Sequence, residues 1–94
     1  MTTLHLINKP GEPIKLCQRA LTPGDAILLL EDGIYLLSSN TSFLGTLTKK
    51  HSIYILDNDQ QARGILCHDN NIIAVDYARF VDLTIFYDRV ISWF

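Results

Sequence analysis

Cys17 is the first residue whose type and setting could support chemistry. As a thiolate, its sulfur could attack a sulfane sulfur and carry it as a persulfide, because only the thiolate is nucleophilic. Lys15 and Arg19 lie two residues away on either side, and nearby positive charge lowers the pKa of a thiol. Cys17 also falls on an apolar stripe with Ile14 and Leu21, where a cysteine packs as a small hydrophobic residue. These residues leave a persulfide-carrying thiol and a packed thiol both open.

Cys67-His68-Asp69 contains the residue types of a nucleophile, a base and an orienting carboxylate. Adjacent side chains point in different directions, however, and functional sets of this kind are assembled in space rather than in sequence. We therefore interpret Cys67 as a loop cysteine beside polar residues, with a stand-alone cysteine-dependent enzyme as the alternative. No Cys-x-x-Cys or His-x-x-x-His spacing occurs, so the sequence predicts no metal and no cofactor.

Acidic residues follow three of the apolar runs, at Glu31-Asp32, at Asp57 and Asp59, and at Asp76. Paired carboxylates could serve acid–base chemistry or hold magnesium, and a receiver-like signalling module using Asp32 or Asp57 is one alternative. Helix N-capping by Asp32, Asp57 and Asp76 explains their positions without either role. The chain contains neither a G-x-G-x-x-G motif nor a P-loop.

The elements that position these residues alternate between strand and helix. An unbroken aliphatic run over residues 27–30 predicts a central strand buried on both faces, as in parallel sheets. The alternation predicts an α/β fold, a small three-layer sandwich with a mostly parallel sheet of four or five strands, as a single domain over residues 1–94. The expected strands cover residues 4–7, 26–30, 52–56, 72–75 and 90–94, and the expected helices cover 13–21, 33–38, 43–47, 57–63 and 77–87.

Composition limits the surroundings in which the protein can work. Hydrophobic residues make up 48% and charged residues 19% of the chain, and the formal net charge is −2. Because cations do not cluster beyond Lys49-Lys50, we do not expect strong nucleic-acid binding by this chain alone. No apolar stretch approaches the roughly 18 residues of a membrane span, no signal peptide is recognisable, and the two cysteines are far apart. We therefore expect a location in the reducing cytoplasm, away from the membrane.

An apolar excess in so small a chain indicates that part of its surface meets a partner. The segment 77–87 is apolar over much of its circumference, and a sheet can cover only one face of a helix. Aromatic residues are enriched where protein partners bind. We therefore predict Phe80, Tyr87, Trp93 and Phe94 at such an interface.

Four stretches form an ordered pattern along nearly the whole chain. Residues 4–10 are followed by 24–35, which include LLLEDGIY, then by 53–64, which end in ARG. Residues 75–84, VDYARFVDLT, form the last stretch, and Trp93 comes after it. This order and spacing resemble the DsrE/DsrF/DsrH-like sulfur-relay family, and specifically its DsrH/TusB branch.

The resemblance implies a small parallel α/β sandwich that works as one of three related subunits in a heterohexamer. The sister subunits would be TusC/TusD-like, equivalent to DsrF/DsrE-like, and sulfur carrier proteins would act through the complex. Such complexes support persulfide transfer for 2-thiolation of the tRNA wobble uridine. A DsrH-type subunit in dissimilatory sulfur oxidation is the alternative.

The family also bears on the two cysteines. Its main sulfur-carrying cysteine belongs to the DsrE/TusD subunit, which this chain does not resemble. Cys17 matches a cysteine in the first helix of DsrH proteins that many TusB proteins lack, whereas Cys67 matches no family cysteine. The resemblance therefore implies a non-catalytic or auxiliary subunit, with Cys17 as a candidate persulfide carrier.

Overall fold

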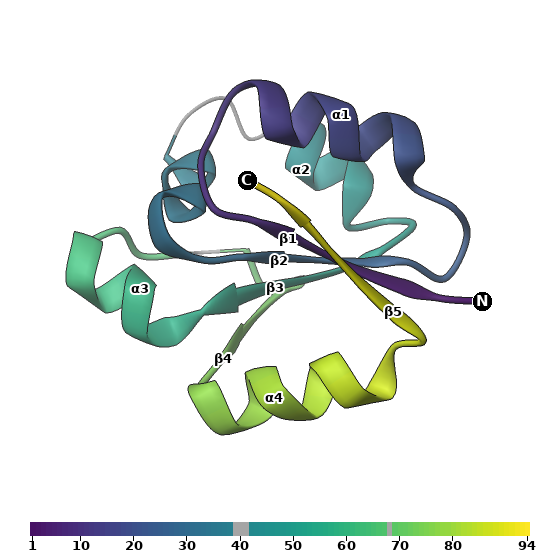
Figure 1. The fold of residues 1–94 in the computed structure, drawn as a ribbon. Coiled ribbons are helices and arrows are strands. Elements are labelled where there is room, and N and C mark those ends of the chain that lie inside the picture. Colours follow the sequence, from purple (N-terminus) through teal and green to yellow (C-terminus); the bar gives the residue numbers. More distant parts are fainter. Residues whose placement is uncertain (39–41, 68) are drawn as a thin grey trace.

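The computed structural model describes residues 1–38, 42–67 and 69–94. Its strands are β1 (Thr3–Ile7), β2 (Ala26–Leu29), β3 (Ser52–Leu56), β4 (Ile72–Val75) and β5 (Arg89–Trp93). They form one sheet in the order β4-β3-β2-β1-β5 (Figure 1). Each neighbouring pair is parallel, so the predicted α/β class is confirmed.

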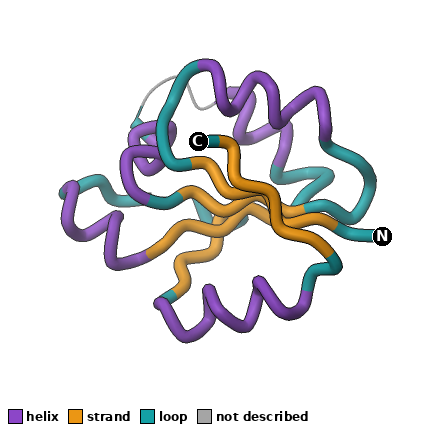
Figure 2. The backbone as a smooth tube through the Cα atoms, viewed as in Figure 1, coloured by secondary structure: helices purple, strands orange, loops and turns teal. Residues whose placement is uncertain are grey.

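Helices make up the layers on either side of this sheet. They are α1 (Glu12–Ala20), the 3₁₀ helix η1 (Glu31–Leu37), α2 (Ser42–Leu47), α3 (Asp57–Arg63) and α4 (Tyr77–Phe86). α1 and α2 lie over one face and α4 over the other (Figures 1 and 2). η1 and α3 follow the carboxyl ends of β2 and β3. After β4, α4 carries the chain back under the sheet, so that β5 pairs with the free edge of β1.

The three central strands are buried on both faces, as the aliphatic run of β2 predicts. Leu28 and Leu56 belong to the core cluster beneath α4, whereas Ile27 and Ile53 belong to the cluster beneath α1 and α2. β4 and β5 form the two edges of the sheet and are more exposed. No helix in the described ranges is long and apolar enough to cross a membrane.

Aspartate capping occurs at one of the three predicted helix starts. The Asp76 side chain accepts a hydrogen bond from the backbone N–H of Arg79 at 2.8 Å, so the capping of α4 is confirmed. The prediction that Asp32 and Asp57 cap helices is wrong, because η1 and α3 have no side-chain cap. α3 starts directly after β3, and η1 starts one residue after β2, so the N-cap residues are Leu56 and Leu30 and each aspartate lies inside the first turn. There its charge faces the positive end of the helix instead.

Candidate functional site

Cys17 lies on the inner face of α1. Pro13 stands in the first turn, where its missing N–H sacrifices no hydrogen bond, and Pro13, Ile14 and Cys17 form the buried stripe of the helix. Cys17 has no exposed surface and packs in the cluster beneath α1 and α2. The charged neighbours Lys15 and Arg19 lie on the exposed side of the helix.

The surroundings of Cys17 keep its thiol protonated. Burial and, second to it, the negative charge of Asp25 raise the pKa of Cys17 to about 12. Lys15 and Arg19 were expected to lower this pKa, but α1 turns both side chains toward water, where their charges are screened. The structure therefore contains a packed thiol that is not activated as a nucleophile.

A buried hydrogen-bonded network joins β1, the turn before β2, and β5. Asp25 Oδ2 lies 2.9 Å from Nε2 of His5, and Nε1 of Trp93 lies 2.9 Å from Nδ1 of the same ring. The Asp25 carboxylate also accepts hydrogen bonds from the backbone N–H groups of Thr3 at 3.0 Å and Thr22 at 3.1 Å. Because His5 and Asp25 are almost completely buried, these contacts satisfy groups that water cannot reach.

The indole of Trp93 determines where the proton of this network sits. An indole N–H can only donate, so Nδ1 of His5 accepts and the ring proton lies on Nε2, facing Asp25. Burial alone would raise the pKa of Asp25. The hydrogen bonds from His5 and from the N–H groups of Thr22 and Thr3 outweigh burial and hold this pKa below its usual value. Since both nitrogens of His5 are engaged, the ring offers no lone pair to a thiol.

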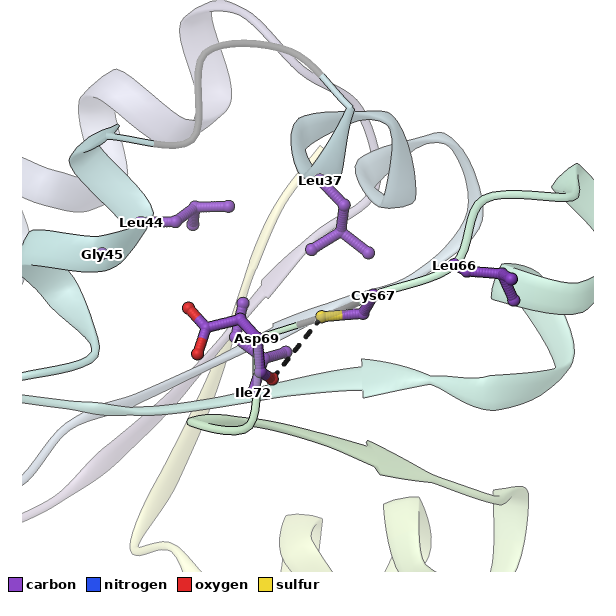
Figure 3. A pocket seen from close by; sticks show the side chains of 7 residues that line it. All are labelled: Leu37, Leu44, Gly45, Leu66, Cys67, Asp69 and Ile72. Carbon is purple, nitrogen blue, oxygen red and sulfur yellow. Dashed lines mark hydrogen bonds between the residues drawn. The ribbon is translucent and has the colours of Figure 1, made fainter.

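Cys67 is the more accessible of the two cysteines. Its Sγ lies 3.8 Å from the backbone carbonyl oxygen of Asp69, while the Asp69 carboxylate accepts the N–H of Asn71. The predicted Cys67-His68-Asp69 set includes His68, which lies outside the described residues. Cys67 lines a cavity of about 320 Å³ together with Leu37, Leu44, Gly45, Leu66, Asp69 and Ile72 (Figure 3).

The four aromatic residues predicted at an interface occupy different environments. Tyr87 is 8% exposed in the core beneath α4, where burial and a hydrogen bond with Tyr54 raise its pKa to about 12. Phe80 packs against the same core, and Trp93 is partly buried. Phe94 is 62% exposed. Within this set, Phe94 presents a large side chain at the surface. Phe80 and Tyr87 pack in or against the core beneath α4, and Trp93 packs against the core beneath α1 and α2.

A set of exposed apolar residues on α4 was not singled out from the sequence. We name Tyr77, Val81, Ile85 and Phe86 the α4 outer face. Their exposed fractions range from 54% for Val81 to 77% for Ile85. Tyr77, Val81 and Ile85 recur at four-residue spacing. Because Leu83 is buried against the sheet, helical periodicity puts these three residues on the side of α4 that points away from the sheet. The sequence therefore contained the signal for this face.

Two of the family-like motifs meet at the carboxyl ends of β2 and β3. Arg63 contacts the carboxylates of Asp32 at 3.0 Å and Asp59 at 3.7 Å, and Asp59 accepts the backbone N–H of Glu31 at 2.6 Å. Glu31 has a φ of 49°, a left-handed conformation that is uncommon outside glycine. These charges hold a strained turn in place. Across the described ranges, no three His, Cys, Asp or Glu side chains gather as metal ligands would.

The fold and the site thus define a small parallel α/β domain with one fully buried thiol beside a hydrogen-bonded His–Asp–Trp network. A family model for DsrH-like proteins matches residues 10–90 of the chain. The protein named Protein TusB in Salmonella arizonae, and that in Salmonella newport, are each 36% identical over 77 residues, 80% of this chain and 81% of theirs. The ychN protein from E. coli has a TM-score of 0.71 at 13% identity, covering 98% of this chain and 99% of its own.

The chain belongs to the DsrH family, as the sequence pattern implies. This membership makes it a sulfur-relay subunit. The likeness to the ychN protein shows the shared fold alone, because the two sequences have diverged too far to carry a function across.

Proposed function

We propose that this chain is a subunit of a cytoplasmic sulfur-relay complex that supports persulfide transfer for 2-thiolation of the tRNA wobble uridine. Its partners are TusC/TusD-like sister subunits in a heterohexamer. The similarity to proteins named TusB over 80% of the chain supports this branch of the family. The chain contributes to assembly, and Cys17 is an auxiliary sulfur site whose burial requires a change of structure before it reacts.

The observation that carries the assembly role is the α4 outer face. Ile85 and Phe86 leave 77% and 76% of their side chains in water, and apolar surface of this extent in a soluble domain marks an interaction site. Ile73 of β4 and Val90 of β5 are also exposed, at the two edges of the sheet face that α4 covers, because they pair with Tyr54 and Leu4, which face α4. A sister subunit with an apolar face of its own is the occupant that we propose.

A substitution of Ile85 by aspartate tests this docking surface. The side chain is exposed in the isolated chain, so we expect the stability of the subunit to change by no more than about 0.5 kcal/mol. At an apolar interface the new carboxylate would be buried without a partner, which costs about 2–4 kcal/mol of binding free energy. The measurement is the yield of sister subunits that copurify with the tagged chain after co-expression with its genomic neighbours.

The matched control is Gln18→Asp, which adds the same charge to the exposed side of α1, on the opposite face of the sheet. We expect at least a tenfold loss of copurified partner with Ile85→Asp and none with Gln18→Asp. Equal recovery with Ile85→Asp and the unmodified chain would rule out α4 as the docking face.

A DsrH-type subunit in dissimilatory sulfur oxidation is the second candidate. The observation that favours it is Cys17, a cysteine in the first helix. The sister subunits recovered in the copurification, and the acceptor to which they pass sulfur, distinguish the two functions. A sulfur acceptor on the tRNA-modification route supports the first function, and an acceptor on the oxidation route supports the second.

A further inference from the structure

Trp93 occupies the nitrogen of His5 that could act as a base. Nε2–H faces Asp25, so the basic lone pair of the neutral ring is on Nδ1, which accepts the indole N–H. A carboxylate behind an imidazole holds one tautomer and stabilises the imidazolium that forms when the ring takes up a proton. His5 and Asp25 therefore have the arrangement of a base and its orienting group, with Trp93 as a cap on the base.

The strand that carries this cap is held on one side only. β5 pairs with β1 and has no other neighbour in the described sheet. Every residue of β1 is buried, whereas Arg89, Val90 and Ser92 of β5 are exposed. Trp93 stands opposite Ile7 at the last position of the ladder. Segments with little buried surface open at lower free energy than the whole fold, so β5 can move while the central strands stay folded.

Cys17 is the thiol in the part of the core next to this network. Trp93 packs against the core cluster that contains Cys17, and the negative charge of Asp25 is, after burial, the second cause that raises the pKa of Cys17. With the cap in place, that charge opposes ionisation of the thiol and no base is available to take its proton. Once the indole has left, Nδ1 of His5 offers its lone pair on the side where Trp93 had packed.

We propose that Trp93 is an autoinhibitory cap on a His5–Asp25 base that activates Cys17. The proposal rests on the proposed function, because it concerns how Cys17 takes up sulfur. With the cap displaced, His5 accepts the Cys17 proton at Nδ1, and the thiolate attacks the terminal sulfur of a donor persulfide, R–S–SH. The donor S–S bond breaks, and Cys17 becomes Cys–S–SH. The leaving R–S⁻ takes the proton from His5 to become R–SH, so the exchange needs no oxidant or reductant.

Among the described residues, His51 and Arg89 also border this network. Nδ1 of His51 lies 2.9 Å from the backbone carbonyl oxygen of Asp25, and the Arg89 guanidinium lies 3.5 Å from the Thr3 hydroxyl. Asp25 is the charged group that contacts the His5 ring directly.

The test measures how fast iodoacetamide alkylates Cys17 across a range of pH in a Cys67→Ser background, so that Cys17 is the reacting thiol. Trp93→Phe removes the indole N–H and keeps an aromatic ring. We expect it to accelerate alkylation at neutral pH at least tenfold and to move the midpoint of the rate profile by one pH unit or more, toward lower pH. Adding His5→Gln should cancel both effects. Phe94→Leu, a change at the exposed neighbour, should have neither effect.

A cap that merely helps packing gives a different result. Trp93→Phe would then raise the rate by the same factor at every pH, with an unchanged midpoint, and His5→Gln would not reverse the gain. That outcome overturns the proposal. Because the assay contains no sister subunit and no sulfur donor, its failure leaves the assembly role to be judged by the copurification experiment.

A second measurement needs no variant at the network. Nitrogen NMR of the histidine rings in the intact chain should show His5 protonated at Nε2 and unprotonated at Nδ1 at neutral pH. A His5 ring that carries its proton on Nδ1, or on both nitrogens, would mean that the indole does not cap a basic lone pair and would overturn the proposal.

Discussion

Asp25→Ala is expected to lower the free energy of unfolding by about 3–5 kcal/mol, because it removes one partner of a buried pair. The change leaves the Nε2–H of His5 and the N–H groups of Thr3 and Thr22 without an acceptor in a region closed to water. The free energy of unfolding of a native protein is about 5–15 kcal/mol in total, so the variant loses a large part of it. Urea unfolding measures the loss.

Asp82→Ala is the matched control, since Asp82 is exposed on α4 and should change stability by no more than about 0.5 kcal/mol. Asp25→Asn keeps one acceptor oxygen and is the variant to measure if the alanine variant does not fold. We expect it to cost about 1–3 kcal/mol. Wild-type stability in both Asp25 variants would contradict the structural role given to this network.

The same carboxylate makes stability depend on pH. The pKa of Asp25 is lower in the folded chain than in the unfolded chain, where it is about 3.9. The folded state therefore binds fewer protons, and the stabilisation is fully present above the unfolded pKa. It is lost as the pH falls through the folded pKa. Asp25→Asn should lack this acidic component, and an identical acid profile in both proteins would contradict it.

Gly33→Ala is expected to cost about 3 kcal/mol, the upper part of the range for overpacking. A Cβ at Gly33 would overlap the carbonyl oxygen of Ile7, and the next nearest atoms also belong to the backbone, at Ile7 and Asn8. A flexible side chain could rotate away, but these atoms are fixed at the end of β1. The same carbonyl accepts the N–H of Leu30 at 3.1 Å, so moving it also breaks a hydrogen bond.

Gly45→Ala provides the opposite expectation within the same protein. Gly45 lies in α2, and a Cβ there would meet no atom within 4 Å. Alanine is the better helix former, so we expect a gain of about 0.5–1 kcal/mol. Urea unfolding measures the free energy of unfolding of both variants, and so compares Gly33, where a Cβ meets backbone atoms, with Gly45, where it meets none. Equal effects of the two substitutions would show that η1 does not pack on the end of β1 as described.

Hydrophobic pattern made much of the fold predictable. The run over residues 27–30 has no alternation, and burial of β2 on both faces follows from this directly. Ile14 and Cys17 recur at helical spacing, which placed the thiol on the inner side of α1. Both inferences depend on neighbours in sequence, where the periodicity of strands and helices is visible.

The His5–Asp25–Trp93 network could not be read from local sequence. His5 is 20 residues from Asp25 and 88 from Trp93, and the parallel sheet brings them together. The available signal was a histidine inside the otherwise apolar strand 4–7, where burial requires a partner. The pattern alone names no partner, because that depends on which strands become neighbours.

The capping errors at Asp32 and Asp57 have a similar origin. The sequence pattern identifies an aspartate near a helix start, but only an aspartate at the N-cap position itself caps the helix. Here the N-cap positions are Leu30 and Leu56, so Asp32 lies two positions and Asp57 one position past the cap. Asp32 instead pairs with Arg63, a residue 31 positions away. Contacts of that kind depend on the fold.

The most direct test of the sulfur-relay account is the intact mass of the purified complex after incubation with a persulfide donor. The chain is first co-expressed with its genomic neighbours and isolated with its sister subunits. The account predicts a stable complex in which this chain gains the mass of one sulfur atom, and a Cys17→Ser chain that assembles but gains nothing. A complex in which this chain never gains sulfur would contradict the role of Cys17. Failure to form any complex would contradict the proposed function itself.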